Sequence, residues 1–232
     1  MERSDKGSAA PPDVARKSAG ATTLIVVRHG ETVGNSSIRY YGRTDLELSD
    51  LGLRQMAAAR EWLMRHFANA ALAPVFASPL RRASAGARII AGPAASIVEL
   101  EEFVEVNFGR FEGLTADEIG ARYPEDFARW TRDRLDPRFT YPGGERRADF
   151  VLRVARGVKV MLEVMAARAA EPAAGVALLV AHRGVIRVVT RELAGVEPVI
   201  ELGSIQLLCR EAPGAQWRAE RRDVIDHLAG VV

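Results

Sequence analysis

Two uninterrupted apolar runs constrain the fold of this chain more than any other feature. Residues 24–27 read LIVV and residues 176–181 read VALLVA, and neither run alternates with polar side chains. Such a pattern is typical of strands that are buried on both faces of a parallel sheet. The first run is followed by Arg28 and His29, and the second by His182. The sequence therefore predicts two central strands whose carboxyl ends carry titratable side chains.

Shorter strands and amphipathic helices alternate along the rest of the chain. Because strands that alternate with helices form doubly wound sheets with right-handed crossovers, we predict a three-layer α/β/α sandwich with a mostly parallel central sheet. This domain is expected to cover residues 22–232, and residues 101–113, which lack a helical stripe, are expected to form an exposed loop. Further strands are predicted at 74–78 and 96–100, and in an edge hairpin at 204–209 and 216–222. Helices are predicted at 48–67, 79–90, 124–134, 145–170 and 185–193, with a short helix capped by Thr115 and Glu118.

Composition limits the class of protein and of partner. The chain has 232 residues, of which 48% are hydrophobic and 27% charged, as in ordinary soluble proteins. Its formal charge of +2 is spread along the chain, so no general attraction to nucleic acid is indicated. The single cysteine, Cys209, excludes an intramolecular disulfide and fits a reducing compartment.

Targeting signals and membrane segments are not expected. No apolar run approaches the roughly 20 residues that a membrane span needs, and residues 1–22 lack the apolar middle of a secretory signal. We therefore expect a cytoplasmic protein without a membrane partner, for which a homodimer is a candidate assembly. Residues 1–21 are rich in Ser, Ala, Pro and basic side chains and are predicted to form a flexible tail.

Three predicted strand ends carry the side chains that suggest chemistry. They supply Arg28 with His29, Ser78 with Arg82 a turn later, and His182. Because the carboxyl ends of parallel strands meet at one edge of a sheet, these side chains are expected to share one crevice. Guanidinium groups, imidazoles and helix amino termini together suit a phosphate group.

A histidine in such a pocket can attack phosphorus and form a phosphohistidine. The step needs an acid for the leaving oxygen and cations for the developing charge, and Glu105 is the candidate acid. Glu101, Glu102 and Glu112 compete with Glu105 for this role, and the first two are expected to be solvated. The other histidines, His66 and His227, and the helix cation Arg81 are expected in solvent; Glu31 and Glu145 are expected to be structural.

Four motifs occur in an order that matches a known family. They are RHGET at 28–32 followed by Asn35, SPLRRA at 78–83, Glu105 ahead of FGRFEG at 108–113, and AHRG at 181–184. Over residues 23 to about 208 the chain resembles the histidine phosphatase superfamily, the phosphoglycerate mutase-like proteins. The resemblance implies that His29 is the phosphorylated nucleophile and Glu105 the proton donor. It also implies that Arg28, Arg82 and His182 hold the phosphate, with Asn35 as an accessory donor. Glu112 matches a second position of the family's motif and is expected to hold the loop rather than to transfer protons.

Two departures from the family pattern concern the substrate. Arg183 follows His182 where many relatives have a small residue, and YYGR at 40–43 replaces a common Gln-Gly version. We predict Gly42, Arg43 and Arg183 as substrate-binding residues. With Arg39 and Arg110 as further candidates, they extend the cationic pocket toward a polyanionic or carboxylated substrate.

The family contains phosphatases and mutases, and the fate of the phosphohistidine separates them. A mutase excludes water with a closing lid, whereas a phosphatase activates water on the phosphoenzyme. Residues 115–141 pass quickly into PGGE at 142–145, as in the phosphatase branch. We therefore predict hydrolysis of a small phosphorylated metabolite without a metal or cofactor. A cofactor-dependent phosphoglycerate mutase, which is an isomerase, is the alternative, and a catalytically silent phospho-ligand-binding protein ranks last.

Overall fold

A six-stranded sheet forms the centre of the structure, a computed structural model that describes residues 21–67, 71–133, 135–168 and 175–231. The order of strands across the sheet is β3-β2-β4-β1-β5-β6. The strands are β1 (Thr22–Arg28), β2 (Leu72–Ala77), β3 (Ile97–Glu99), β4 (Val176–Ala181), β5 (Ile205–Arg210) and β6 (Arg218–Val224). The α-helices are α1 (Asp50–His66), α2 (Arg81–Ala91), α3 (Ala116–Arg122), α4 (Pro124–Arg132), α5 (Arg147–Ala167) and α6 (Arg183–Ala194). Short 3-10 turns are η2 (Glu101–Phe103), η3 (Gly109–Phe111) and η4 (Asp226–Leu228). The tail predicted at residues 1–21 lies, except for its last residue, outside the described residues.

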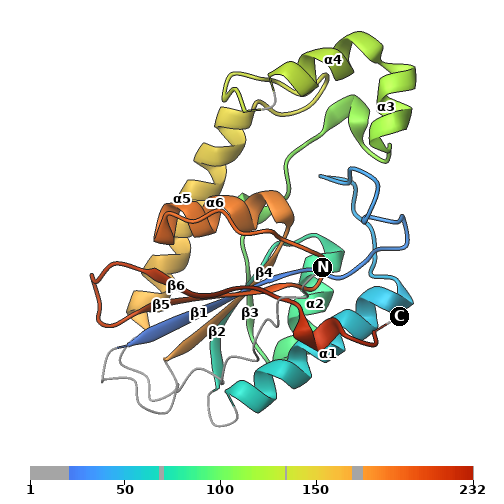
Figure 1. The fold of residues 1–232 in the computed structure, drawn as a ribbon. Coiled ribbons are helices and arrows are strands. Elements are labelled where there is room, and N and C mark those ends of the chain that lie inside the picture. The colour runs from blue at the N-terminus through green and yellow to red at the C-terminus, as the bar shows by residue number, and fades with distance from the viewer. Residues whose placement is uncertain (1–20, 68–70, 134, 169–174, 232) are drawn as a thin grey trace, which may run out of the picture.

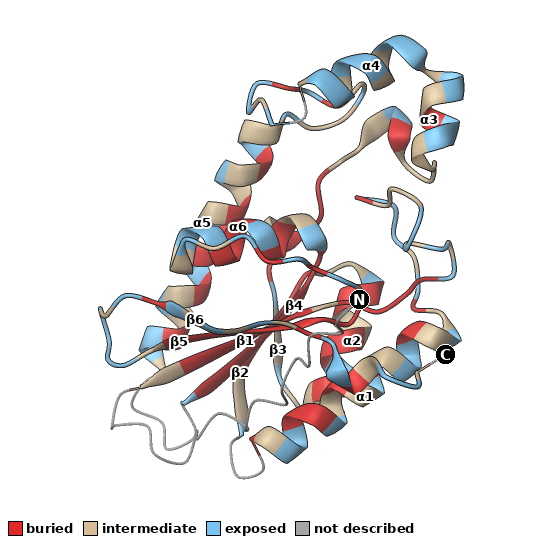
Figure 2. Cartoon of the chain, in the orientation of Figure 1, coloured by how far each residue is buried: buried red, intermediate tan, exposed pale blue. Residues whose placement is uncertain are grey.

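Helices cover both faces of the sheet, so the predicted three-layer α/β/α sandwich is confirmed (Figure 1). Successive side chains of a strand point to opposite faces. Leu24 and Val26 accordingly pack with α5 and α6, whereas Ile25 and Val27 pack with α1 and α2. The central strands are buried along most of their length (Figure 2). The apolar runs that lack alternation therefore belong to strands with a core on each side.

The strands that were predicted to carry the site are neighbours. β1 pairs with β4 in parallel, with Arg28 opposite Ala181, and β2 pairs with β4 in parallel on the other side. Their carboxyl ends consequently lie at one edge of the sheet. β5 runs antiparallel to β1, and β6 antiparallel to β5, so the predicted edge hairpin is confirmed.

Residues 101–113 are not the exposed loop that the sequence led us to expect. The side chains of Phe103, Val104, Val106 and Phe111 are buried, and the segment forms the turns η2 and η3. It is covered because α5 packs against η2, where Gly157 has no side chain to separate them. The prediction failed because Gly157, where the covering helix makes this contact, lies more than 40 residues beyond the end of the segment.

Helices α3 and α4 lie beyond the sheet, next to the loop that follows β1 (Figure 1). The predicted capping box is present, since Thr115 Oγ1 accepts the N–H of Glu118 and the Glu118 carboxylate accepts the N–H of Thr115. The ring of Tyr40 meets the rings of Phe108 and Trp130 edge-on, at centroid distances of 5.4 and 5.5 Å. Aromatic contacts therefore join α4 to the loop after β1 and to the segment of Glu105.

Two histidines that we expected in solvent are packed. His66 is half-buried and stacks on Trp62, with ring centroids 3.9 Å apart. His227 is buried, and its Nε2 lies 3.0 Å from the carbonyl oxygen of Gly203. The expectation for His227 was wrong because η4 folds back against α1.

The close approach of α5 to η2 gives a stability prediction. A Cβ at position 157 would lie 2.6 Å from Glu102 Cβ and 2.7 Å from the ring of Phe103. We expect Gly157→Ala to lower the free energy of unfolding by about 1–3 kcal/mol, because overpacking outweighs the better helix propensity of alanine. The control Gly120→Ala in α3, where a Cβ would touch Phe127 at 3.4 Å, should lose no stability. Urea unfolding measures both; a Gly157→Ala variant as stable as the wild type would contradict the packing.

Candidate active site

The carboxyl ends of three adjacent strands bring the predicted site residues together. Arg28 ends β1 and His29 follows it, Ser78 follows β2, and His182 follows β4. The rings of His29 and His182 lie edge to face, with centroids 5.1 Å apart. The two histidines, which are about 150 positions apart in sequence, thus share one pocket.

His29 has a defined tautomer. Its Nδ1 lies 2.7 Å from the carbonyl oxygen of Gly30. A carbonyl can only accept a hydrogen bond, so Nδ1 carries the proton of the neutral ring and Nε2 carries the lone pair. Burial, together with the charges of Arg82 and Arg28, holds the pKa of His29 well below its usual range. His29 is therefore a neutral imidazole with an available nitrogen at neutral pH.

His182 is anchored by the neighbouring strand end. Its Nε2 lies within hydrogen-bonding distance of Ser78 Oγ, at 2.8 Å, and Ser78 Oγ accepts the N–H of Leu80 at 3.3 Å. Burial is the main cause that lowers the pKa of His182, followed by the charges of Arg82, His29 and Arg28. The other ring nitrogen, Nδ1, is buried and has no hydrogen-bond partner among the residues that the structure describes.

Two arginines supply positive charge next to these rings. Arg82 is fully buried, and its terminal nitrogens donate to the carbonyls of Gly42 at 2.7 Å and Thr44 at 2.8 Å. Arg28 donates from Nη1 to the carbonyl of Ile200 at 3.0 Å, and desolvation lowers the pKa of Arg28 to about 10, which leaves it charged at neutral pH.

Three nitrogen atoms in this pocket remain without a partner in the described part of the chain: Arg28 Nε, Arg82 Nε and His182 Nδ1. Buried polar groups in proteins are nearly always hydrogen-bonded. A cluster of unpartnered nitrogens beside two buried cations therefore indicates the binding of an anion.

Glu105 lies buried beside the same pocket. One carboxylate oxygen accepts the N–H of Val106 at 2.9 Å, and the other accepts the N–H of Gly184 at 2.9 Å. Burial raises the pKa of Glu105 above its usual range, and it outweighs these two hydrogen bonds and the charges of Arg82 and Arg28. The group can therefore hold a proton at a pH where an exposed glutamate has lost it.

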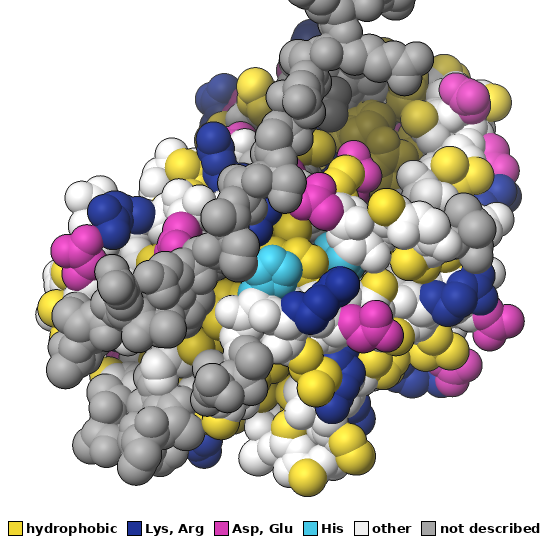
Figure 3. Space-filling view, turned by 60° about the horizontal axis from the view of Figure 1, so that its bottom comes forward, with side chains coloured by type: hydrophobic (Ala, Val, Ile, Leu, Met, Phe, Trp, Pro, Cys, Tyr) yellow, Lys and Arg dark blue, Asp and Glu magenta, His cyan; other side chains and the backbone are white. Residues whose placement is uncertain are grey.

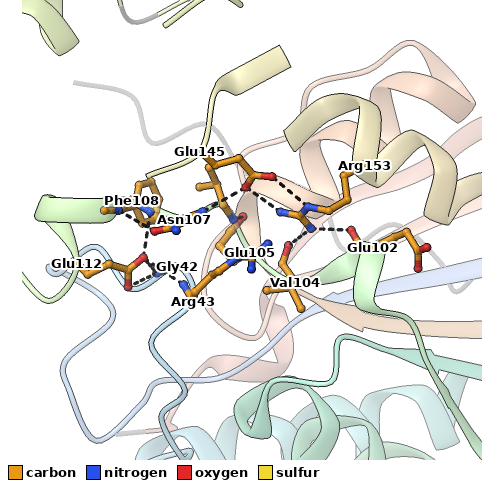
Figure 4. A network of polar contacts seen from close by, with 12 residues as sticks. Gly42, Arg43, Glu102, Val104, Glu105, Asn107, Phe108, Glu112, Glu145 and Arg153 are labelled. Carbon is orange, nitrogen blue, oxygen red and sulfur yellow. Dashed lines mark hydrogen bonds and ion pairs between the residues drawn. The ribbon is translucent and has the colours of Figure 1, made fainter. Parts of the chain in front are cut away.

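An ion pair between Arg153 of α5 and Glu145, which lies just before that helix, fixes the backbone on both sides of Glu105. Arg153 binds Glu145 at 2.8 Å and donates from Nη1 to the carbonyls of Glu102 and Val104, at 3.0 and 2.8 Å. Glu145 in turn accepts the N–H of Asn107 at 3.3 Å. Figure 4 shows the pair between the two ends of the segment that carries Glu105. Glu145 is structural, as expected.

Glu112 holds the loop at residues 42–44, as the sequence led us to expect. Its carboxylate accepts the N–H groups of Gly42, Arg43 and Thr44, the hydroxyl of Thr44, and the N–H of Phe108 (Figure 4). Arg82 binds the carbonyls of the same loop from the other side. The N–H of Gly42 is thus used within the protein, and a side chain at this position would collide with the carbonyl of Val106.

The remaining predicted residues lie at the surface. Asn35 is exposed and has a left-handed backbone conformation with φ of 59°. Arg43 is exposed, and Arg183 is exposed with its Nε donating to Ile200 at 3.1 Å. Two weaker candidates are engaged elsewhere: Arg39 pairs with Glu118, and Arg110 lies 3.7 Å from Asp126. Arg81, expected as an exposed cation, pairs with Asp45 and Glu47.

Sequence reasoning missed two backbone groups that shape the pocket. The carbonyl of Ile200 accepts hydrogen bonds from Arg28 and Arg183. The N–H of Gly203 lies 3.2 Å from the carbonyls of both Arg28 and His29, while its own carbonyl contacts His227. These backbone groups belong to the irregular segment between α6 and β5, and no pattern of side chains in the sequence predicts their contacts.

Other classes of site receive little support from the described residues. They contain no group of three or more His, Cys, Asp or Glu side chains arranged to hold a metal ion. None of their helices combines the length and the apolar character that crossing a bilayer requires. Over the part of the surface that Figure 3 describes, basic and acidic side chains lie interspersed.

The depressed histidine pKa values give a prediction for stability against pH. Below about pH 6.5 the unfolded chain protonates His29 and His182 while the folded chain does not, so the free energy of unfolding should fall as pH drops from about 7 to 5. The raised pKa of Glu105 acts in the opposite direction. The double variant His29→Asn, His182→Asn should therefore show a shallower fall than the wild type. Urea unfolding in phosphate-free buffer tests this, and equal slopes would contradict it.

Comparisons with known proteins agree with this arrangement. The family model described as histidine phosphatase superfamily (branch 1) matches residues 24–207. A glucosyl-3-phosphoglycerate phosphatase from Mycolicibacterium vanbaalenii is 32% identical over 176 residues, which cover 74% of this chain and 74% of that protein. A 2,3-bisphosphoglycerate-dependent phosphoglycerate mutase 2 from Gloeobacter violaceus is 30% identical over 181 residues, 75% of this chain and 77% of that protein. The native structure of a mycobacterial glucosyl-3-phosphoglycerate phosphatase superposes with a TM-score of 0.68 at 26% identity, over 88% of this chain and 100% of that chain.

Some relatives are much longer. The chain is 39% identical over 137 residues, 59% of its length, to the bifunctional protein Rv2228c of Mycobacterium tuberculosis, but spans only 36% of that protein. The family model, in contrast, covers most of the present chain, including all four motifs and the three strand ends that form the pocket. The chain therefore belongs to branch 1 of the histidine phosphatase superfamily.

Proposed function

We propose that this enzyme hydrolyses a phosphomonoester of a small metabolite through a phosphohistidine on His29. The observation that carries the proposal is the state of His29 itself: it is buried and neutral, and the Gly30 carbonyl fixes its proton on Nδ1. A neutral imidazole whose Nε2 lone pair lies beside buried guanidinium groups is a nucleophile suited to an anionic substrate.

In the first step Nε2 of His29 attacks phosphorus and the bond to the ester oxygen breaks. Glu105 gives its proton to that oxygen, so the product leaves as an alcohol. Arg28, Arg82 and His182 bind the phosphoryl oxygens and neutralise the charge that develops on them, and the exposed Asn35 is a candidate for a further donor. The hydrogen bond from Nδ1 to the Gly30 carbonyl stabilises the positive charge that the ring gains.

In the second step water attacks the phosphohistidine. Glu105, now a carboxylate, takes a proton from the water, the P–N bond breaks, and inorganic phosphate and neutral His29 are restored. Burial of Glu105 supports both roles, because a raised pKa suits a group that alternately gives and takes a proton near neutral pH.

Hydrolysis is favoured over mutase activity by the short connection between the Glu105 segment and α5. Among its described residues the helices are α3 and α4, of 7 and 9 residues, whereas a mutase needs a cover that keeps water from the phosphoenzyme. Because one relative is a phosphoglycerate mutase, mutase activity is the alternative to test. A mutase would isomerise 3-phosphoglycerate in the presence of bisphosphoglycerate without releasing phosphate. The lone buried cysteine, Cys209, supports a cytoplasmic site of action.

Loss of the nucleophile should stop both steps. We expect His29→Ala to lower phosphate release from p-nitrophenyl phosphate by at least about 10³-fold and to abolish an acid-labile phosphoprotein. The control His66→Ala, which removes an imidazole on α1, should retain both. Rapid-quench trapping measures the phosphoprotein, and its persistence in the His29→Ala variant would refute the assignment.

The effect of removing the acid on the rate should depend on the leaving group. We expect Glu105→Gln to slow alkyl phosphates by about 10²–10⁴-fold and p-nitrophenyl phosphate much less, because nitrophenolate leaves without protonation. The variant should also lose the decline in rate that the wild type shows as Glu105 ionises with rising pH. Glu101→Gln, on the exposed face of η2, is the matched control. Equal losses for both esters would argue against Glu105 as the acid.

A further inference from the structure

Two guanidinium groups meet at a single backbone carbonyl at the edge of the pocket. The oxygen of Ile200 accepts a hydrogen bond from Arg28 Nη1 at 3.0 Å and from Arg183 Nε at 3.1 Å. The two charges are close enough that Arg183 contributes to lowering the pKa of Arg28. Adjacent like charges repel, and within the described ranges neither guanidinium forms an ion pair with a carboxylate. An anion that contacts both would relieve this repulsion.

Arg183 is the most exposed of the three arginines at this site. Arg82 is fully buried, Arg28 is half-buried and Arg183 is exposed. Arg28 and Arg82 lower the pKa of both catalytic histidines, whereas the charge of Arg183 acts on Arg28. A phosphoryl group that reacts at His29 is therefore held by the inner arginines, and Arg183 is left for another part of the substrate.

The hydrogen bonds of Arg183 indicate which chemical group of the substrate it can bind. Its Nε donates to the carbonyl of Ile200. Its terminal nitrogens, Nη1 and Nη2, have no partner among the residues that the structure describes. Two such nitrogens present parallel N–H bonds that match the two oxygens of a carboxylate. Its backbone is fixed as the first residue of α6, directly after His182.

We propose that Arg183 binds a carboxylate that the substrate carries in addition to its phosphoryl group, so that the preferred substrates are phosphorylated hydroxy acids. This inference rests on the proposed phosphatase function. The bound carboxylate offsets the charge of the Arg28 and Arg183 pair, and it orients the leaving group relative to Glu105, whose carboxylate accepts the N–H of the next residue, Gly184.

The test compares two esters of the same three-carbon length. 3-Phosphoglycerate has a carboxylate where glycerol 3-phosphate has a hydroxymethyl group. We expect Arg183→Gln to lower kcat/KM for 3-phosphoglycerate by about 10- to 100-fold, mainly through KM, since a charge-assisted hydrogen-bonded pair is lost. The value for glycerol 3-phosphate should change by less than about 2-fold. Arg187→Gln, one turn further along α6 and also exposed, should change neither value.

Arg183→Lys separates a paired guanidinium contact from a simple positive charge. We expect it to recover only part of the loss, because an ammonium group lacks the planar pair of donors. An equal loss for both esters, or no loss for either, would overturn the carboxylate site. The failure of the proposed function has a different signature: the wild type would then not release phosphate from p-nitrophenyl phosphate.

Discussion

The site depends on the cost of placing positive charge in a buried pocket. Three parallel strands end side by side and deliver two guanidinium groups and two imidazoles into a region with little water. Burial is the main cause that lowers the pKa values of His29 and His182 well below the usual range, and the charges of the neighbouring arginines add to it. His29 is therefore left with a lone pair beside the groups that bind an anion. The same buried cluster of arginines and histidines thus produces both the nucleophile and the phosphate-binding site.

The pocket is rigid because pairs of side chains hold its loops from two directions. Arg82 binds the carbonyls of the loop at 42–44 while Glu112 binds its N–H groups. Arg153 and Glu145 do the same for the segment of Glu105. A group that transfers protons must be placed within a fraction of an ångström, so the support around Glu105 is as much a part of the site as its own carboxylate. The arrangement also explains why residues 101–113, which look like a surface loop, are buried.

Sequence patterns predicted those parts of the fold that are determined locally. The apolar runs identify β1 and β4, the capping box places the start of α3, and the helix predicted at 145–170 corresponds to α5. The motifs identify the residues that the structure brings into one pocket. Features that depend on distant backbone groups could not be predicted: the burial of His227 against Gly203, the shared carbonyl of Ile200, and the contact of Arg39 with Glu118. Each of these contacts joins two segments that are far apart in the chain and share no sequence pattern.

The central claim is that phosphoryl transfer proceeds in two displacements, with His29 between them. Each in-line displacement inverts the configuration at phosphorus, so two displacements restore it. The most direct measurement is the stereochemical course of hydrolysis of a phosphomonoester made chiral with oxygen isotopes and sulfur. The account predicts overall retention of configuration in the inorganic thiophosphate released. Inversion would mean that water attacks the substrate directly, and it would contradict a phosphohistidine on His29.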